Sequence, residues 1–411
     1  MPVVIPVEEA LEIVLAHTPR LPAEEVSLDA ALGRVLAEDV ASDVDLPPFD
    51  RSAMDGFALR AEDVAGAPVT LPVQGLVRAG QHPETALQAG SAIQIMTGAP
   101  VPPGATAVQP VEKTRSADGG RRVEVLAAVE PGAHIARRGS EVRAGDVVLR
   151  GGESVDPPAV AVLAAVGKAR VRVGRRPRVS VLVTGDELVD VSEKPGPGRI
   201  RNSNGPAVLA QARWAGAEAV SLGVVHDDEA RIASAVGEGL GSDVLVVSGG
   251  VSEGVYDLVE GVFAHFGVEV LFDKVALKPG APLVFGRRRD TLVFGLPGNP
   301  VSAQVTFDLF VRAALLRMQG ARVVSRPLLE VELLGLVRNR SGRQAHLPAR
   351  VRYEGGRLVA DPLRSMGSAD IAAHARANAL VVMAADRREA RAGERAPARL
   401  LGNFLERDGA A

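Results

Sequence analysis

The clearest hydrophobic pattern lies in the second half of the chain, where short apolar runs alternate with segments of helical periodicity. Five β-branched runs are predicted strands: 179–184, 217–225, 244–247, 268–272 and 292–296. Four segments between and after them have helical spacing: 206–215, 228–239, 256–266 and 300–318. This alternation predicts a doubly wound, largely parallel sheet that binds its ligands at the carboxyl ends of the strands.

The flanking regions have different patterns. Residues 7–16 have the apolar spacing of a helix, and residues 27–38 predict a second amphipathic helix with Ser27 as its N-cap. A third helix is predicted over 151–167, opened by Asp156 and two prolines. The short Val and Leu runs of 69–150, broken by Gly and Pro, predict an all-β insert. Beyond residue 325, short strands predict a small β domain: 328–336, 349–353, 358–360 and 379–383.

Composition narrows the class of protein. A chain of 411 residues is long enough for two to four domains. The net charge of -3 argues against a general nucleic-acid binder, and the absence of Cys excludes disulfides, thiolate catalysis and Cys-type zinc sites. We expect a cytoplasmic protein, because the N-terminus lacks a basic n-region and no apolar run reaches membrane-spanning length.

Three of the predicted strands end in unusual loops. Asp186 and Glu187 follow the first strand, the stretch 248–257 follows the third, and 296–303 follows the last. A strand that runs into Ser-Gly-Gly and then a helix is the layout of an anion-binding turn. Each loop alone is more typical of an ordinary capped helix N-terminus, but all three at one sheet edge favour a phosphate- or nucleotide-containing ligand. Neither a Walker motif nor a Rossmann fingerprint is present.

Carboxylates are the more promising chemical groups, because the seven His residues are scattered and none forms an HExxH motif. The candidate acids are Asp50, Asp55, Glu141, Asp186, Glu187, Asp227, Asp228 and Asp257. Oxygen-rich clusters beside a phosphate site favour Mg²⁺. The structural alternatives are an N-cap acid pair at Asp227 and Asp228 and an exposed turn at Asp186 and Glu187.

Seven spaced motifs carry a resemblance to a known family. They are Pro-Phe-Asp-Arg-Ser-Ala-Met-Asp-Gly-Phe-Ala at 48–58, Ile-Met-Thr-Gly-Ala-Pro at 95–100, Thr-Gly-Asp-Glu-Leu at 184–188, Asn-Ser-Asn at 202–204, and the stretches 248–257, 278–280 and 296–303. In this order they resemble the MoeA family, the molybdopterin molybdenumtransferases, which include the gephyrin E-domain. The resemblance covers nearly the whole chain.

The resemblance implies a multidomain α/β and β protein. It implies an elongated helical domain (1–45 and 145–177), an inserted β-rich domain (46–144), a MogA-like doubly wound α/β domain that binds molybdopterin (178–324) and a C-terminal β-barrel-like domain (325–411). It also implies a homodimer with its site in a cleft between subunits. Further partners implied are a MogA-like adenylyltransferase and molybdoenzyme maturation proteins, without nucleic acid or membrane.

The reaction implied is the Mg²⁺-dependent insertion of molybdate into adenylylated molybdopterin, with release of AMP, as the last step of molybdenum cofactor synthesis. The motif match implies catalytic residues in two domains: Asp55, Thr97, Glu187, Asp228 and Asp257. Substrate would be bound by Gly249, Gly250, Ser252, Lys278, Pro297, Gly298, Asn299 and Ser302. Molybdate would meet Lys278, Arg343, Arg350 and Ser368, and Mg²⁺ would meet Asp257, Glu187 and Glu141.

The chain departs from the family pattern in several places. Glu253, Val255 and Glu260 stand where relatives often carry a hydrophobic residue, an acid and a lysine, and Pro348, Ala372 and Ala373 replace an Arg and two serines that help hold molybdate. Two alternatives therefore stay open: a catalytically weakened pterin-binding or assembly paralogue, and a homologue that prefers tungstate. Sequence cannot separate molybdate from tungstate, since the two anions have nearly the same size and charge.

Overall fold

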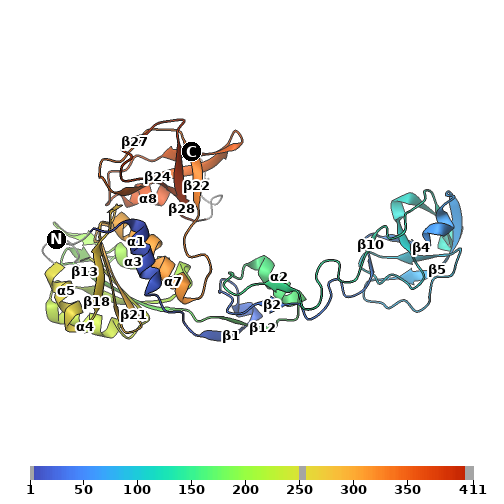
Figure 1. Cartoon of the computed structure of the whole chain (residues 1–411), viewed down its shortest axis with the longest axis horizontal. Helices are drawn as coiled ribbons and strands as arrows, with labels where there is room; N and C mark the ends of the chain where they lie inside the picture. The colour runs from blue at the N-terminus through green and yellow to red at the C-terminus, as the bar shows by residue number, and fades with distance from the viewer. Residues whose placement is uncertain (1–3, 250–255, 403–411) are drawn as a thin grey trace. The chain divides into compact units, whose positions relative to one another are not determined.

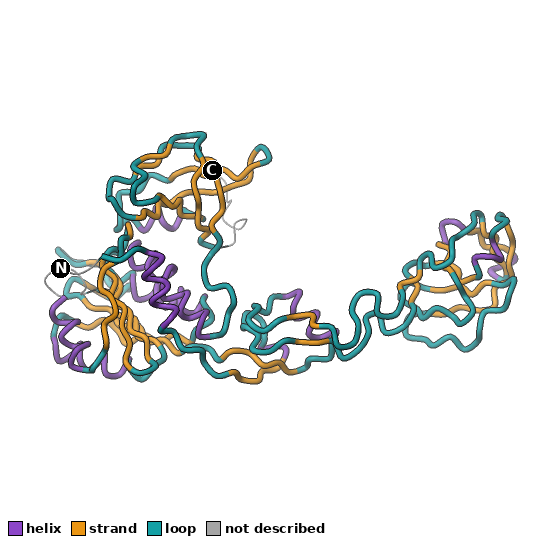
Figure 2. Tube along the Cα trace, viewed as in Figure 1, coloured by secondary structure: helices purple, strands orange, loops and turns teal. Residues whose placement is uncertain are grey.

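The structure, a computed structural model, describes residues 4–249 and 256–402. Contacts divide the chain into two compact units. Unit 1 contains residues 1–38, 151–156 and 170–411, and unit 2 contains residues 39–150 and 157–169. Figures 1 and 2 show unit 2 as mostly strands and loops and unit 1 as a layered α/β body followed by a second group of strands.

The centre of unit 1 is a six-stranded sheet in the order β16-β13-β17-β21-β20-β18. Its strands are β13 (Arg178–Thr184), β16 (Glu218–Val225), β17 (Val244–Ser248), β18 (Glu269–Lys274), β20 (Pro282–Arg288) and β21 (Thr291–Leu296). The first four strands in that order pair in parallel, as predicted. The prediction missed β20, which pairs antiparallel with both neighbours. The β20–β21 hairpin thus interrupts the expected strand–helix alternation.

Helices cover both faces of this sheet (Figure 1). One apolar core lies beneath α1 (Val7–Ala16), α3 (Asn204–Trp214) and the rod formed by α6 (Pro300–Thr306), a π turn (Phe307–Val311) and α7 (Arg312–Met318). A second core lies beneath α4 (Glu229–Gly239) and α5 (Tyr256–His265). Fully buried strands explain the continuous Val and Leu runs, because both faces exclude water.

The C-terminal strands of unit 1 close into a barrel. The strands are β22 (Leu328–Leu333), β24 (Gln344–Glu354), β25 (Arg357–Pro362), β26 (Ala379–Met383) and β28 (Arg395–Leu400). They pair in the order β24-β25-β22-β28-β26, and β26 pairs back onto β24. This confirms the predicted barrel-like fold. Strand β19 (Leu277–Lys278) pairs with β24, and α8 (Ile371–Arg376) precedes β26.

The helix predicted over residues 27–38 is wrong. The segment instead follows β1 (Ala23–Ser27), which pairs with β12 (Arg170–Gly174), and contains only a 3-10 turn at Leu28–Ala30. Gly33 has a φ of +74°, and Val35 and Leu36 form bridges to residues 154 and 173. Pairing with distant chain segments therefore overrides the local helical pattern. The helix predicted over 151–167 is confirmed as α2 (Pro157–Ala165), in unit 2.

Unit 2 is built on a six-stranded sheet in the order β7-β4-β6-β5-β9-β8. Its strands are β4 (Gly56–Leu59), β5 (Val69–Val77), β6 (Ala92–Ile95), β7 (Ala107–Pro110), β8 (Thr114–Ala117) and β9 (Arg122–Val125). Unit 2 also contains two separate two-stranded sheets. One pairs β3 (Arg51–Ser52) with β10 (Ile135–Ala136), and the other pairs β2 (Val40–Ala41) with β11 (Val147–Leu149). The all-β prediction for this region is confirmed. The exact domain boundaries stay predictions.

Candidate functional site

The carboxyl ends of β13, β17 and β21 meet closely at one edge of the unit 1 sheet. Gly249, directly after β17, has a φ of +95° and donates its N–H to the carbonyl of Leu296 at 3.3 Å. A Cβ at residue 249 would lie 2.2 Å from the carbonyl oxygen of Thr184. Only glycine satisfies both conditions. Gly249, at the start of the predicted anion-binding turn, is therefore held within backbone contact of the two neighbouring strands.

Asn204, the first residue of α3, links these strand ends. Its Nδ2 donates to the Ser248 hydroxyl at 3.0 Å and to the carbonyl of Gly298 at 2.8 Å. Asn204 and Ser248 are both buried. This amide donor satisfies two acceptors, so it adds a side-chain link between Ser248 and the Gly298 loop to the backbone pairing of β17 with β21.

Carboxylates gather beside the end of β13. Asp186 Oδ1 lies 3.0 Å from His226 Nδ1 and accepts the N–H of Asp227 at 3.2 Å. Burial raises the pKa of the Asp227 carboxyl, and the charges of Asp186 and Glu187 raise it further. Asp227 Oδ1 is a buried atom without a hydrogen-bond partner among the described residues. This corner therefore carries negative charge that the described part of the protein leaves incompletely balanced.

Asp228 has a structural contact of its own. Its side chain is the N-cap of α4 and accepts the N–H of Arg231 at 2.9 Å. The N-cap interpretation of the acid pair is therefore confirmed for Asp228 but not for Asp227, whose carboxyl lies near the other acids. The catalytic role predicted for Asp228 stays a prediction.

Ser302, which is predicted to bind substrate, and the residues predicted to bind molybdate lie around the start of α6 and on or beside the barrel. Ser302 is buried in α6, and the carbonyl of Ser368 accepts the N–H of Val301 at 3.0 Å. A Cβ at Gly280, two residues after Lys278, would lie 3.6 Å from the carbonyl of Ser302. The loop of Lys278 and the loop of Ser368 thus both contact α6, directly after Pro297, Gly298 and Asn299.

Two further residues predicted for molybdate lie on or beside the longest barrel strand. Arg350 is in β24 and donates from Nε to the carbonyl of Arg376 at 3.1 Å. Arg343 directly precedes β24, and its carbonyl accepts from the Asn339 side chain at 2.8 Å. Within the described residues no hydrogen bond or ion pair joins either guanidinium to Lys278 or Ser368, so their role in binding molybdate stays a prediction.

The remaining predicted residues are in unit 2 or outside the described residues. Asp55 Oδ1 accepts two hydrogen bonds from Thr97, from the backbone N–H at 2.6 Å and from the hydroxyl at 2.9 Å. These bonds lower the pKa of the Asp55 carboxyl. Glu141, also in unit 2, forms an ion pair with Arg51 at 2.9 Å. Gly250, Ser252 and the side chain of Asp257 lie outside what the structure describes.

Family comparisons match the three parts of this architecture. Residues 5–167 match the MoeA N-terminal region (domain I and II), residues 180–317 match a probable molybdopterin binding domain, and residues 330–401 match the MoeA C-terminal region (domain IV). The chain belongs to the MoeA family. The sheet edge of unit 1 therefore lies in the part of a MoeA chain that matches the probable molybdopterin binding domain.

Named MoeA relatives extend over most of the chain. A Bacillus subtilis protein, molybdopterin molybdenumtransferase, is 36% identical over 92% of this chain and 90% of its own length. Molybdopterin molybdenumtransferase 2 of Mycobacterium tuberculosis is 40% identical over 81% of this chain and 84% of its own. The solved Pyrococcus horikoshii OT3 MoeA protein is 32% identical, has a TM-score of 0.82 and is covered completely. The likeness therefore includes both units.

Sequence reasoning missed the roles of Asn204 and Asp227 in this MoeA chain. Asn204 stands in the Asn-Ser-Asn motif, but only the fold brings it to Ser248 and Gly298. Asp227 was paired with Asp228 as a possible helix cap, although a helix needs only one capping side chain. Two adjacent acids, Asp227 and Asp228, were therefore the signal in the sequence that one of the carboxylates has another environment.

The acidic corner fits Mg²⁺ in part. Glu187 and Asp227 belong to one repelling group, and Asp227 has an unpartnered buried oxygen that a cation would satisfy. No group of three His, Cys, Asp or Glu side chains within the described ranges has the geometry of a metal site. Mg²⁺ needs no such group, because it usually keeps several waters and takes one or two carboxylates plus substrate phosphates. Glu141 is paired with Arg51 instead.

Proposed function

We propose that this protein is a molybdopterin molybdenumtransferase, which uses Mg²⁺ to insert molybdate into adenylylated molybdopterin and releases AMP. The observation that carries the proposal is the sheet edge at Gly249, where three strand ends lie in backbone contact beside an acidic corner. The names of relatives that span most of the chain support the substrate class. The reaction is the last step of molybdenum cofactor synthesis.

The sheet edge would bind the phosphate and pterin parts of the substrate. Donors for phosphate oxygens would come from the backbone after Gly249 and from Asn299, whose side chain makes no capping hydrogen bond at the start of α6. Gly298 leaves room here, since a Cβ there would lie 3.7 Å from Gly249 Cα. The proposed oxyanion site comprises Lys278, Ser302 and Ser368, with Arg343 and Arg350 as further candidates.

Glu187 and Asp227 would hold Mg²⁺, together with Asp257. When bound, the ion neutralises negative charge that develops on the phosphoryl oxygens during cleavage of the anhydride. The carboxylates themselves would position the substrate phosphates next to the ion. They would stay charged, because the cation offsets the repulsion between Asp227 and its acidic neighbours. Asp227 thus replaces Glu141 in our proposed metal set.

We further propose that the active protein is a homodimer in which Asp55 and Thr97 of one subunit face the unit 1 site of the other. The hydrogen bonds from Thr97 support this role, because they keep the Asp55 carboxylate charged and oriented without help from unit 1. A cytoplasmic location and contacts with a MogA-like adenylyltransferase or with molybdoenzyme maturation proteins stay predictions. No helix in the described ranges is both long and apolar enough to cross a membrane.

The test is an AMP-release assay with adenylylated molybdopterin, Mg²⁺ and either molybdate or tungstate. We expect release that requires both Mg²⁺ and the oxyanion, and its loss in the Asp257→Ala and Asp55→Ala variants. Tight substrate binding without turnover would contradict the proposed enzymatic activity and would favour the pterin-binding or assembly paralogue. Competition between the two oxyanions in the same assay separates a molybdate enzyme from a tungstate-preferring one.

A further inference from the structure

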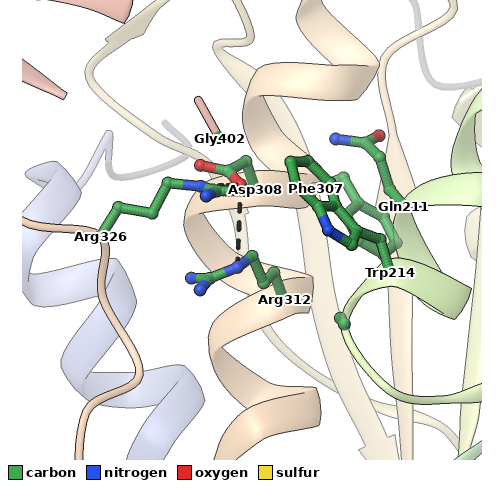
Figure 3. A pocket seen from close by; sticks show the side chains of 8 residues that line it. Gln211, Trp214, Phe307, Asp308, Arg312, Arg326 and Gly402 are labelled. Carbon is green, nitrogen blue, oxygen red and sulfur yellow. Dashed lines mark hydrogen bonds and ion pairs between the residues drawn. The ribbon is translucent and has the colours of Figure 1, made fainter. Parts of the chain in front are cut away.

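A second cavity lies in unit 1 at the other end of α3. It has a volume of about 210 Å³ and is lined by α3, the π turn, α7 and the segment after α7, as Figure 3 shows. A neighbouring cavity of about 550 Å³ shares four of its lining residues: Gln211, Trp214, Asp308 and Arg326. Asn204, at the sheet edge, lies ten residues before Trp214, about 15 Å along the helix. The cavity is therefore separate from the proposed active site.

The charges that line this cavity do not balance. Arg326 donates from Nε to Asp308 Oδ1 at 2.7 Å, and Arg312 Nε lies 4.0 Å from the same oxygen. All three side chains are largely buried, with exposed fractions of 14% for Arg326, 21% for Arg312 and 8% for Asp308. Among the described residues that line the cavity, two guanidinium groups thus share one carboxylate, which leaves one positive charge in excess.

Among the described residues, Asp308 is the only carboxylate that lines the cavity. Arg399 lies behind Arg326 and donates to its carbonyl at 3.1 Å, and the charges that act on Arg399 are those of Asp308, Arg326 and, most weakly, Glu8. Burial lowers the pKa of Arg312, and the charge of Arg326 lowers it further. A buried excess of positive charge is costly unless an anion pairs with it.

The polar groups of the cavity also include an unpaired acceptor. Gln211 donates from Nε2 to the carbonyl of Gln304 at 3.0 Å, whereas its Oε1 is buried without a partner in the part of the chain described. Trp214, three residues further along the same helix, is 64% exposed and has the Arg326 guanidinium 5.0 Å from its ring centroid. A large exposed aromatic ring beside buried guanidinium groups is a surface that suits a flat or apolar group carrying a negative charge.

We propose that this cavity binds a small organic anion, namely a carboxylate or phosphate attached to a flat or apolar body. The anionic group pairs with Arg312 and Arg326 in the smaller cavity, through guanidinium N–H groups other than the one that Arg312 Nη1 donates to the carbonyl of Val324 at 3.0 Å. The body lies along Trp214 in the larger cavity, and an N–H or O–H of the ligand donates to Gln211 Oε1. None of the residues that line either cavity belongs to the proposed active site, although the larger cavity borders α6 and α8.

The chain provides its own reporter, because Trp214 is its single tryptophan. Phenyl phosphate and benzoate would be titrated into the full-length protein while indole fluorescence is followed at the red edge of its absorption. We expect a saturable change in emission. Benzyl alcohol, which has the ring but no charge, should bind at least about 10-fold more weakly.

Substitutions that are expected to change the affinity in opposite directions separate a specific effect on binding from a general loss of folding. Arg312→Gln and Arg326→Gln should weaken phenyl phosphate about 10-fold, whereas Asp308→Asn should tighten it about 3-fold or more, because it removes the competing carboxylate. Arg317→Gln is the matched control, since Arg317 is an exposed residue of α7 that does not line the cavity. Calorimetry would measure the affinities of the Arg326 variant, because that substitution also alters the environment of the indole.

The outcomes are distinct. Charge-selective, saturable binding that Asp308→Asn tightens and Arg312→Gln weakens supports the proposal. Equal affinity for phenyl phosphate and benzyl alcohol, or no effect of any of the three cavity substitutions in protein that keeps the wild-type melting temperature, overturns it. AMP release is measured in parallel on the same proteins. Absence of AMP release from the wild type would count against the proposed function and would leave the binding result unaffected.

Discussion

Asp227 in unit 1 and Asp55 in unit 2 differ in how the negative charge of the carboxylate is balanced. In unit 2, two hydrogen bonds from Thr97 satisfy Asp55 and lower its pKa. In unit 1, burial and two neighbouring acids raise the pKa of Asp227, and one of its oxygens has no partner among the described residues. Asp55 is thus favoured in its charged form, whereas we propose that the unit 1 corner binds a cation. Five experiments test this difference.

The largest effect is expected at Gly249. Gly249→Ala adds a Cβ 2.2 Å from the Thr184 carbonyl oxygen at a positive φ, so the strand ends must separate. We expect a loss of about 3 kcal/mol or more of stability and no measurable AMP release. The matched control is Gly261→Ala in α5, where a Cβ meets no atom within 4 Å. It should be neutral or stabilising, and equal melting temperatures for the two variants would contradict the proposed close approach.

Mixing of subunits tests whether the two kinds of acid act together across a dimer. Asp55→Ala and Glu187→Ala should each lower AMP release on the order of 10²-fold or more. Dimers re-formed from an equal mixture should recover roughly a quarter of wild-type activity, because half of them are mixed and each has one intact site. No recovery in a mixture shown to exchange subunits would mean that both acids serve the same subunit.

Mg²⁺ should distinguish the two acids in a thermal-shift measurement without substrate. At a concentration 100-fold above its Kd, Mg²⁺ should stabilise the wild type by about 2.7 kcal/mol. Asp227→Asn should weaken this binding about 10- to 100-fold, since it removes a carboxylate from the acidic corner. Asp55→Asn should leave it unchanged. The same Mg²⁺ response in both variants would refute Asp227 as a ligand.

Asn204 and Thr97 provide a contrast in stability. Asn204→Ala leaves the Ser248 hydroxyl and the Gly298 carbonyl without their donor and should cost about 2 kcal/mol. Thr97→Val removes only an exposed hydroxyl, while its backbone N–H still binds Asp55, so its effect should stay within about 0.5 kcal/mol. Thermal unfolding of both variants measures the difference. Similar losses would mean that the buried link at the sheet edge has no special importance.

The smallest effect concerns pH. The folded pKa of Asp227 is raised, so its charged form opposes folding, and wild type should lose stability relative to Asp227→Asn as pH rises from about 4 through that pKa. The folded pKa of Asp55 is lowered, so its contribution is present above about pH 4 and disappears as pH falls through the folded value. Melting temperatures of both Asn variants against pH, without Mg²⁺, should diverge from wild type in opposite directions.

Much of the fold of unit 1 follows from the sequence, since its strands and helices are long, periodic and buried. The helix over 7–16 and the strand over 379–383 agree with the structure at both ends. The β20–β21 hairpin was missed because β20 (Pro282–Arg288) begins with Pro and lacks a helix before its partner. The helix over 27–38 failed because its residues pair with residues 154 to 174, and such distant pairing leaves no local signal.

The site could be predicted as a set of loops but not as a set of contacts. Chain order showed that residues 184–188, 248–257 and 296–303 end neighbouring strands, which the parallel pairing confirms. It could not show that Asn204 joins two of these loops or that Glu141 is held by Arg51. Such details depend on side-chain distances across segments that are far apart in the sequence, where periodicity gives no information.

The position of α1 has a consequence for the order in which a newly made chain can fold. Its buried residues Val7, Ala10 and Val14 belong to the same core as Val179 and Leu315. During synthesis, roughly 160 residues must follow α1 before the first strand of its sheet emerges, which takes on the order of 10 to 30 s at ribosomal rates. The apolar face of α1 is therefore uncovered throughout the synthesis of unit 2, and a fragment of the α/β body made without residues 5–16 would expose the matching surface permanently.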